Sequence, residues 1–70
     1  MNKNELNAEI ARNGLTIPRL AELIKMDKKT LYSRIKGETS FRQSEIAAIS
    51  TVLKLSGQRI LEIFFSEEVA

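Results

Sequence analysis

Apolar residues recur at helical spacing in five separate stretches of this chain, and polar residues or glycines separate each stretch from the next. No stretch alternates apolar and polar residues for long enough to predict a strand. A length of 70 residues makes one small domain. The pattern therefore predicts an all-α fold, a compact five-helix bundle over residues 1–70, with helices at about 2–13, 17–24, 28–36, 43–54 and 57–65.

The stretch from Thr16 to Gly37 predicts two short helices joined by a tight turn. Thr16 and Asp27 are residue types that cap helix N-termini, and Gly37 is the type that most often ends one. Only Lys25 and Met26 remain between the two helices, so the chain must turn sharply there. Two helices joined in this way indicate a helix-turn-helix over about residues 16–37.

The expected helix at 28–36 has two faces of different chemistry. Leu31 and Ile35 lie about 40° apart on a helical wheel and predict its buried stripe. The opposite face carries no carboxylate and is formed by Lys28, Lys29, Tyr32, Ser33 and Lys36. Two interpretations of this face are possible. Its residues bind a ligand, or its lysines serve only to keep the protein soluble.

The last expected helix has an apolar arc of about 200°, wider than one contact with a small bundle can cover. Ile60, Leu61 and Phe64 form an ordinary buried face, while Ile63 and Phe65 lie at the two ends of the arc. Either the C-terminal residues fold back over the helix, or part of the arc contacts another chain. We favour a partner interface that includes Ile63 and Phe65.

Positive charge is concentrated in the middle of the chain. The net charge is only +2, yet eight basic residues and three acidic residues lie between Arg12 and Arg42. A polyanionic partner explains this distribution, and chance in a short chain is the alternative. A lone aromatic residue in the next loop, Phe41, is expected to plug the core rather than to stack on a ligand.

The composition argues against several other functions. Cysteine and histidine are both missing from the sequence, which removes disulfides, thiolate chemistry, the usual zinc sites and histidine acid–base catalysis. The carboxylates are scattered, so no catalytic or metal-binding cluster is expected. We therefore do not expect the protein to be an enzyme, or to need a cofactor or a small-molecule substrate. No apolar run approaches a membrane span, and the first residues lack the apolar core of a signal peptide. These features predict a cytoplasmic protein without a membrane partner.

With these five helices in order, the chain resembles the small Cro/CI-type (XRE family) helix-turn-helix regulators of temperate phages. The resemblance covers almost the whole chain, from LTIPRLAELIKMDKKTLYSRIKG to IAAISTVLKLSGQRILEIFF. The YSRIKG and ILEIFF segments are similar to a subgroup from phages of Gram-positive bacteria, which includes Cro-like proteins and modulators of repression. The resemblance implies a lambda-repressor-like DNA-binding domain.

The resemblance also implies how DNA would be bound. The helix at 28–36 would be the recognition helix in the major groove, and its base-facing residues would be Lys28, Lys29, Tyr32 and Ser33. Phosphate contacts would come from Thr16, Arg19, Lys36 and Arg42. Two positions depart from the family pattern. Lys25 replaces a frequent glycine of the turn, and Ile17 replaces a glutamine that often grips a phosphate.

Two functions remain open at this point. One is a transcription regulator of the lysis–lysogeny switch, which binds double-stranded operator DNA in the bacterial host cell. Its expected form is a homodimer bound to a palindromic site. The other is an antirepressor or modulator, which binds the cognate phage repressor by protein–protein contacts and binds DNA weakly or not at all. A single protein could combine both activities.

Overall fold

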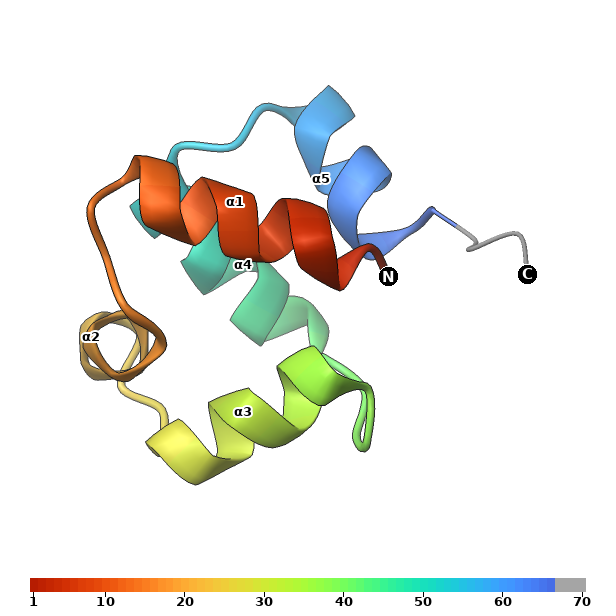
Figure 1. Ribbon diagram of the computed structural model, residues 1–70. Coiled ribbons are helices and arrows are strands. Elements are labelled where there is room, and N and C mark those ends of the chain that lie inside the picture. The colour runs from red at the N-terminus through yellow and green to blue at the C-terminus, as the bar shows by residue number, and fades with distance from the viewer. Residues whose placement is uncertain (67–70) are drawn as a thin grey trace.

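The computed structural model describes residues 1–66, and within them the chain forms five α-helices and no strand (Figure 1). The prediction of an all-α, five-helix fold is therefore confirmed. None of the helices in this part of the chain is long and apolar enough to cross a membrane. The helices are α1 (Lys3–Arg12), α2 (Ile17–Leu23), α3 (Lys28–Lys36), α4 (Gln43–Leu53) and α5 (Gly57–Phe64).

Three helices begin with a side-chain cap. The side-chain oxygens of Asn2, Thr16 and Ser56 each accept the backbone N–H three residues further on, at 3.2, 3.3 and 3.1 Å. Each bond satisfies one of the N–H groups that the first turn of a helix leaves without a partner. Asp27 occupies the expected position before α3, but its side chain makes no capping bond.

Four helices end in the same type of turn. The chain enters the left-handed region at Gly14, Lys25, Gly37 and Lys54, with φ of 69°, 58°, 87° and 57°. In each case the next residue donates its N–H to the carbonyl five residues earlier, at 2.9 to 3.1 Å. Bonds of this span define the Schellman motif. In this motif the residue after the left-handed position lies close to the residue five positions before it. Lysine therefore adopts, at two of the four positions, a conformation that suits glycine better.

The turn between α2 and α3 is longer than the sequence predicts. Helix α2 ends at Leu23, and Ile24 is its C-terminal cap rather than a helical residue. Residues 24–27 therefore join the two helices, because the left-handed Lys25 closes α2 one residue early. The sharp change of direction remains, and α2 packs against both α3 and α4.

Every helix contributes one side chain to the centre of the core. The five largest fully buried side chains come from α1 to α5 in turn and are Leu6, Leu20, Leu31, Ile49 and Ile63. Phe41 packs edge-to-face on Phe64, with 5.4 Å between ring centroids. The prediction that Phe41 plugs the core is therefore confirmed.

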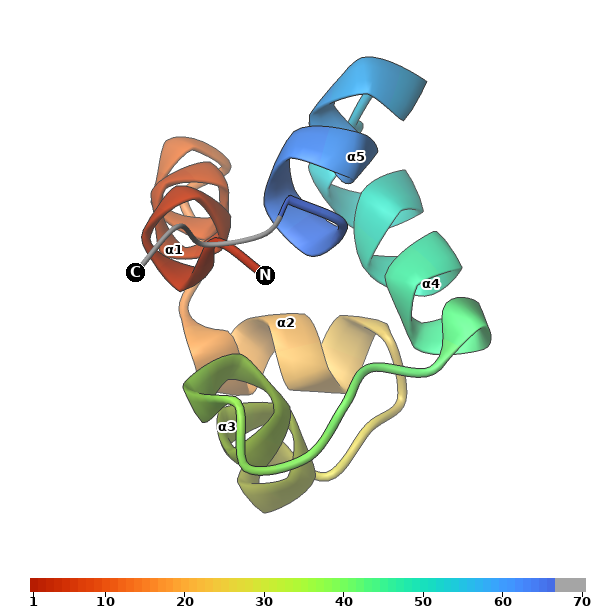
Figure 2. The same cartoon turned by 90° about the vertical axis from the view of Figure 1, so that its right-hand side faces the viewer.

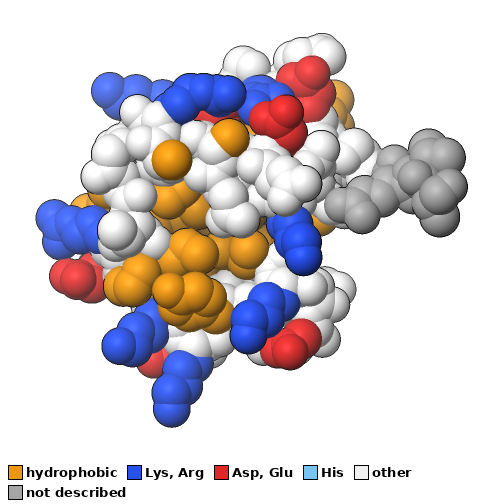
Figure 3. Space-filling view, in the orientation of Figure 1, with side chains coloured by type: hydrophobic (Ala, Val, Ile, Leu, Met, Phe, Trp, Pro, Cys, Tyr) orange, Lys and Arg blue, Asp and Glu red, His pale blue; other side chains and the backbone are white. Residues whose placement is uncertain are grey.

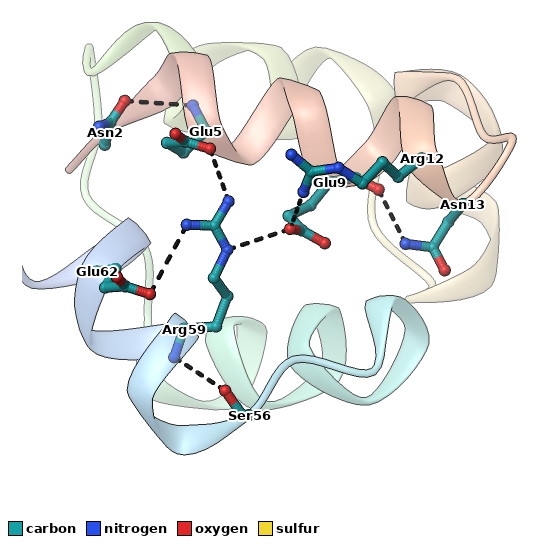
Figure 4. Close-up of polar contacts among 8 residues, drawn as sticks. All are labelled: Asn2, Glu5, Glu9, Arg12, Asn13, Ser56, Arg59 and Glu62. Atoms are coloured by element: carbon teal, nitrogen blue, oxygen red, sulfur yellow. Dashed lines mark hydrogen bonds and ion pairs between the residues drawn. The ribbon is translucent and has the colours of Figure 1, made fainter.

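Helices α1 and α5 lie side by side, which brings residues 1–2 next to residues 63–66 (Figures 1 and 2). The N–H of Asn2 donates to the carbonyl of Ile63 at 2.7 Å. Across the same contact, Arg59 donates to Glu5 at 2.6 Å and to Glu9 at 3.1 Å (Figure 4). The pKa of Glu5 is lowered from its ordinary value of 4.5. The hydrogen bond from Arg59 is the larger cause, and the positive charge of Arg59 is the second. Polar contacts thus reinforce the apolar packing of α5 on α1.

The prediction for the apolar arc of α5 was partly wrong. Ile63, expected at the edge of a partner interface, is fully buried, so it is not available to another protein in this structure. Leu61, expected to be buried, is 58% exposed. The helix is rotated relative to the expected orientation, because its packing against the rest of the core sets which side faces inward. Phe65 is exposed, as expected.

Candidate nucleic-acid interface

Helix α3 presents one side to the core and the other to solvent. Leu31 is fully buried and Ile35 nearly so, which confirms the predicted inward stripe. On the outward side, the ammonium-bearing side chains of Lys28, Lys29 and Lys36 are exposed. Tyr32, 40% exposed, lies among them and adds an apolar surface with a hydroxyl at its end. The five residues predicted for this face therefore share one side of α3, with Ser33 partly buried.

An ion pair that the sequence analysis missed fixes α3 against α4. Nε of Arg34 lies 2.7 Å from Oε1 of Glu45, and the two side chains are only 12% and 15% exposed. The Nε–H does not point at that oxygen, so the contact is an ion pair rather than an aligned hydrogen bond. Arg34 also donates from Nη1 to the hydroxyl of Thr39 at 3.0 Å. Because Glu45 also accepts the N–H of Arg42 at 2.8 Å, one carboxylate links α3 to the start of α4.

Two of the candidate phosphate ligands lie at the start of α2. Thr16 accepts the N–H of Arg19 through its hydroxyl oxygen, which leaves the hydroxyl proton available for a second partner. Arg19 itself pairs with Glu22 at 3.3 Å, and both of these side chains are more than half exposed. An exposed pair of this kind is weak, so a phosphate could replace Glu22 at little cost.

The other two phosphate candidates lie elsewhere. Lys36 is the last residue of α3, and Arg42 immediately precedes α4; both are exposed. Figure 2 shows the start of α4 on the opposite side of the molecule from the start of α2. The structure therefore distributes the four candidates over three helix termini rather than gathering them at one point.

A carboxylate lies on the outward side of α3, contrary to the sequence analysis. The hydroxyl of Ser33 donates to Oε1 of Glu38 at 2.9 Å, and the N–H of Glu38 donates to the carbonyl of Ser33 at 3.0 Å. Helical periodicity could not show this contact, because Glu38 lies beyond the end of the helix. The signal that could have found it is Gly37, since a left-handed glycine turns the next residue back over the last turn.

Basic side chains surround the α2–α3 part of the molecule. In Figure 3, Lys and Arg side chains lie along the left and lower margins, over α2 and α3, with acidic side chains beside some of them, and apolar side chains reach the surface between α1 and α3. Along the upper margin, over α1, basic and acidic side chains are mixed. The excess of positive charge in this part of the molecule comes from the eight basic and three acidic residues between Arg12 and Arg42.

A second surface of different chemistry lies on α5. Leu61 and Phe65 are one helical turn apart and each is 58% exposed. Two large apolar side chains at this spacing lie next to each other on a helix surface. They form a small apolar surface separate from the basic side of α3.

Comparison of the chain with protein-family models, with curated proteins and with solved structures gave no match. The candidate site therefore rests on its geometry and charge. Within residues 1–66, no three acidic side chains are grouped so that they could hold a metal ion.

Proposed function

We propose that this protein is a transcription regulator of the lysis–lysogeny switch of a temperate phage. In this proposal it is a lambda-repressor-like helix-turn-helix protein, with α2 and α3 as the motif and α3 as the recognition helix. It binds operator DNA in the cytoplasm of the bacterial host and catalyses no reaction. The family and the phage origin rest on the sequence resemblance alone.

The observation that carries the proposal is the contrast between the two sides of α3. Leu31 and Ile35 fix the helix on the core, while three exposed lysines and a half-exposed tyrosine lie on the other side. A helix that is rigidly supported from behind and basic in front matches the requirements of the DNA major groove.

The residues on α3 suit base contacts by their chemistry. The ammonium groups of Lys28 and Lys29 can donate to O6 and N7 of guanine in the major groove. The ring of Tyr32 can pack against a thymine methyl group. Because both lysines lie in the first turn of α3, they are in the part of a recognition helix that reaches furthest toward the base edges.

Phosphate contacts would then set the position of α3 on the duplex. Thr16 and Arg19 would contact one strand near the start of α2, and Lys36 and Arg42 would contact the backbone beyond the end of α3. A dimer would place two such units on half-sites about 10 base pairs apart. The ion pair between Arg34 and Glu45 supports this geometry, because it holds α3 at a fixed angle to the helix that follows.

The exposed apolar pair Leu61 and Phe65 favours a second function, that of an antirepressor or modulator. In this alternative the pair contacts the cognate phage repressor, and the DNA contacts of α3 are secondary or absent. The expected glutamine at the start of α2 is replaced by Ile17, which cannot bind a phosphate through its side chain and so is consistent with weaker DNA binding.

A titration of the purified protein with the DNA that flanks its own gene separates the two functions. It is run at moderate salt with competitor DNA, with and without the phage repressor encoded nearby. Specific binding by the protein alone supports the regulator. Binding only with the repressor, or release of the repressor from its operator, supports the modulator. Phe65→Ser should abolish the second effect and leave the first unchanged.

A further inference from the structure

We infer that Ser33 and Glu38 act together as a reader of one C·G base pair, with Glu38 as the specificity-determining residue. This inference rests on the proposed DNA-binding function of α3. Glu38 lies outside the recognition helix, so the proposal adds a base-reading residue from the loop that follows it.

Two hydrogen bonds fix Glu38 against α3. The backbone N–H of Glu38 donates to the carbonyl of Ser33 at 3.0 Å, and the hydroxyl of Ser33 donates back to Oε1 of Glu38 at 2.9 Å. The backbone bond follows from the left-handed Gly37, which has a φ of 87°. The carboxylate is therefore positioned by the end of the helix itself and not by a flexible side chain alone.

The hydrogen-bonding capacity of the pair follows from where its one proton lies. A carboxylate can only accept, and a serine hydroxyl has one proton to donate. Because the Ser33 hydroxyl lies 2.9 Å from Glu38, that proton is committed to the carboxylate. Toward DNA, the pair therefore offers acceptors only: the second carboxylate oxygen and the remaining lone pair of the hydroxyl.

Only cytosine matches an acceptor-only pair in the major groove. Guanine presents two acceptors there, and thymine presents an acceptor and a methyl group. Adenine presents a donor, but an acceptor lies beside it. Cytosine presents its N4 amine alone, to which a glutamate is a suitable acceptor. The pair thus rejects guanine and thymine by repulsion and favours cytosine over adenine.

A lysine beside the pair completes the recognition of a C·G pair. Lys29 and Lys36 lie four residues before and three residues after Ser33, which places both on the same side of α3. Among residues 1–66, Glu38 forms no ion pair with either of them, so the carboxylate remains available to a base. Lys29, one of the base-facing candidates, can donate to O6 and N7 of the guanine that is paired with the cytosine, while Lys36 contacts phosphate.

The other Schellman turns of the molecule show that this arrangement is particular to α3. At the ends of α1, α2 and α4, the residue in the position of Glu38 is Leu15, Met26 or Leu55, each partly buried against the core. At the end of α3 the same turn carries an exposed glutamate. The turn that elsewhere packs an apolar residue inward here places a carboxylate on the outward side of the helix.

The test begins with the wild-type protein and a pool of DNA duplexes that contain a randomised segment. Selection yields the preferred sequence, and each C·G pair in it is then replaced singly. Affinities of wild type, Glu38→Ala and Ser33→Ala are measured on every duplex. We expect both variants to lose preference at one and the same C·G pair by at least about fivefold, since a good base contact discriminates by about 5- to 150-fold.

Two further measurements separate base reading from a general effect of charge. Glu38→Ala removes a negative charge from the side of α3 that is proposed to face the polyanionic duplex, so its affinity for random-sequence duplex should rise while its preference falls. Glu62→Gln removes one negative charge on α5 and is the matched control, for which the base preference should be unchanged. Circular dichroism spectra check that each variant is folded.

The outcomes distinguish the inference from the proposed function. If the wild-type protein prefers a sequence but both variants keep that preference at every position, the inference is wrong and the proposed function stands. If loss of preference occurs at an A·T pair, cytosine reading is also wrong. If the folded wild-type protein selects no sequence, both the inference and sequence-specific DNA binding by the protein alone are overturned.

Discussion

The guanidinium of Arg34 on α3 lies against the carboxylate of Glu45 on α4, with 2.7 Å between Nε and Oε1. Both side chains are largely buried, so removal of one charge leaves the other without its partner in a poorly solvated site. Glu45→Gln should therefore lower the free energy of unfolding by about 3 kcal/mol, the low end of the range for a buried pair, because both side chains keep some exposure. Urea denaturation followed by circular dichroism measures this change.

Two variants make the test of this ion pair sharper. Glu45→Ala also removes the acceptor for the N–H of Arg42 and should cost about 1 kcal/mol more than Glu45→Gln. Glu22→Gln breaks the exposed pair with Arg19 and should cost less than about 0.5 kcal/mol. Equal costs for the buried and the exposed pair would show that the Arg34–Glu45 contact does not fix α3.

Lys25 has a φ of 58° in the turn between α2 and α3, a conformation that costs a residue with a Cβ roughly 1–2 kcal/mol. Lys25→Gly removes this cost and should raise the free energy of unfolding by about 1 kcal/mol, after the greater entropy of glycine in the unfolded chain is subtracted. Denaturation midpoints in urea provide the measurement. Ala47→Gly, on the exposed side of α4, is the control and should lower stability by about 1 kcal/mol. A loss of stability in Lys25→Gly would mean that the turn has another conformation.

Substitution should change the stability of the fold much more at Ile63 on α5 than at Phe65, the C-cap residue that follows this helix. Ile63 is fully buried, so Ile63→Ala should destabilise the fold by about 2–5 kcal/mol. Phe65 is 58% exposed, so Phe65→Ser should change stability by less than about 0.5 kcal/mol. Thermal denaturation measures both, and light scattering shows whether Phe65→Ser changes the state of association. If Phe65→Ser were the more destabilising of the two, the orientation of α5 would be wrong.

The contact between Arg59 and Glu5 predicts a loss of stability in acid. The hydrogen bond from Arg59 lowers the pKa of Glu5 in the folded protein below its ordinary value of 4.5. A lowered pKa contributes stability above about pH 4.5, and this contribution disappears as the pH falls through the folded-state pKa. Arg59→Met, which keeps much of the side-chain length, should therefore lose less stability than wild type between pH 7 and pH 3. Identical acid dependence of the two melting temperatures would refute this role of Arg59.

Local sequence signals were sufficient for most of the fold. Thr16 was correctly predicted as a cap, and Leu31 and Ile35 as the inward stripe of α3. These features depend on residues within one or two turns of each other, so a helical wheel and the known capping preferences capture them. The exposure of the lysines on α3 follows from the same wheel.

Contacts between elements could not be predicted in this way. Which side of α5 faces the core depends on how the helix packs, and the sequence of α5 alone placed Ile63 at the wrong edge. The Arg34–Glu45 pair depends on the angle between α3 and α4. The contact between Ser33 and Glu38 lay within reach of local reasoning, but only if the geometry of the turn at Gly37 is considered together with the helix.

The central claim is that the basic side of α3 reads DNA. The most direct test compares wild type with the double variant Lys28→Ala/Lys29→Ala. The affinity of each protein is measured for a selected duplex and for random-sequence duplex over a range of salt concentrations. Lys54→Ala, outside this face, controls for the loss of a lysine. We predict that wild type and Lys54→Ala prefer the selected duplex and lose affinity steeply with salt, by about 0.9 log units per log unit of salt for each phosphate contact. The folded double variant should lose the preference. Full retention of both preference and affinity in the double variant would contradict the assignment of α3 as the recognition helix.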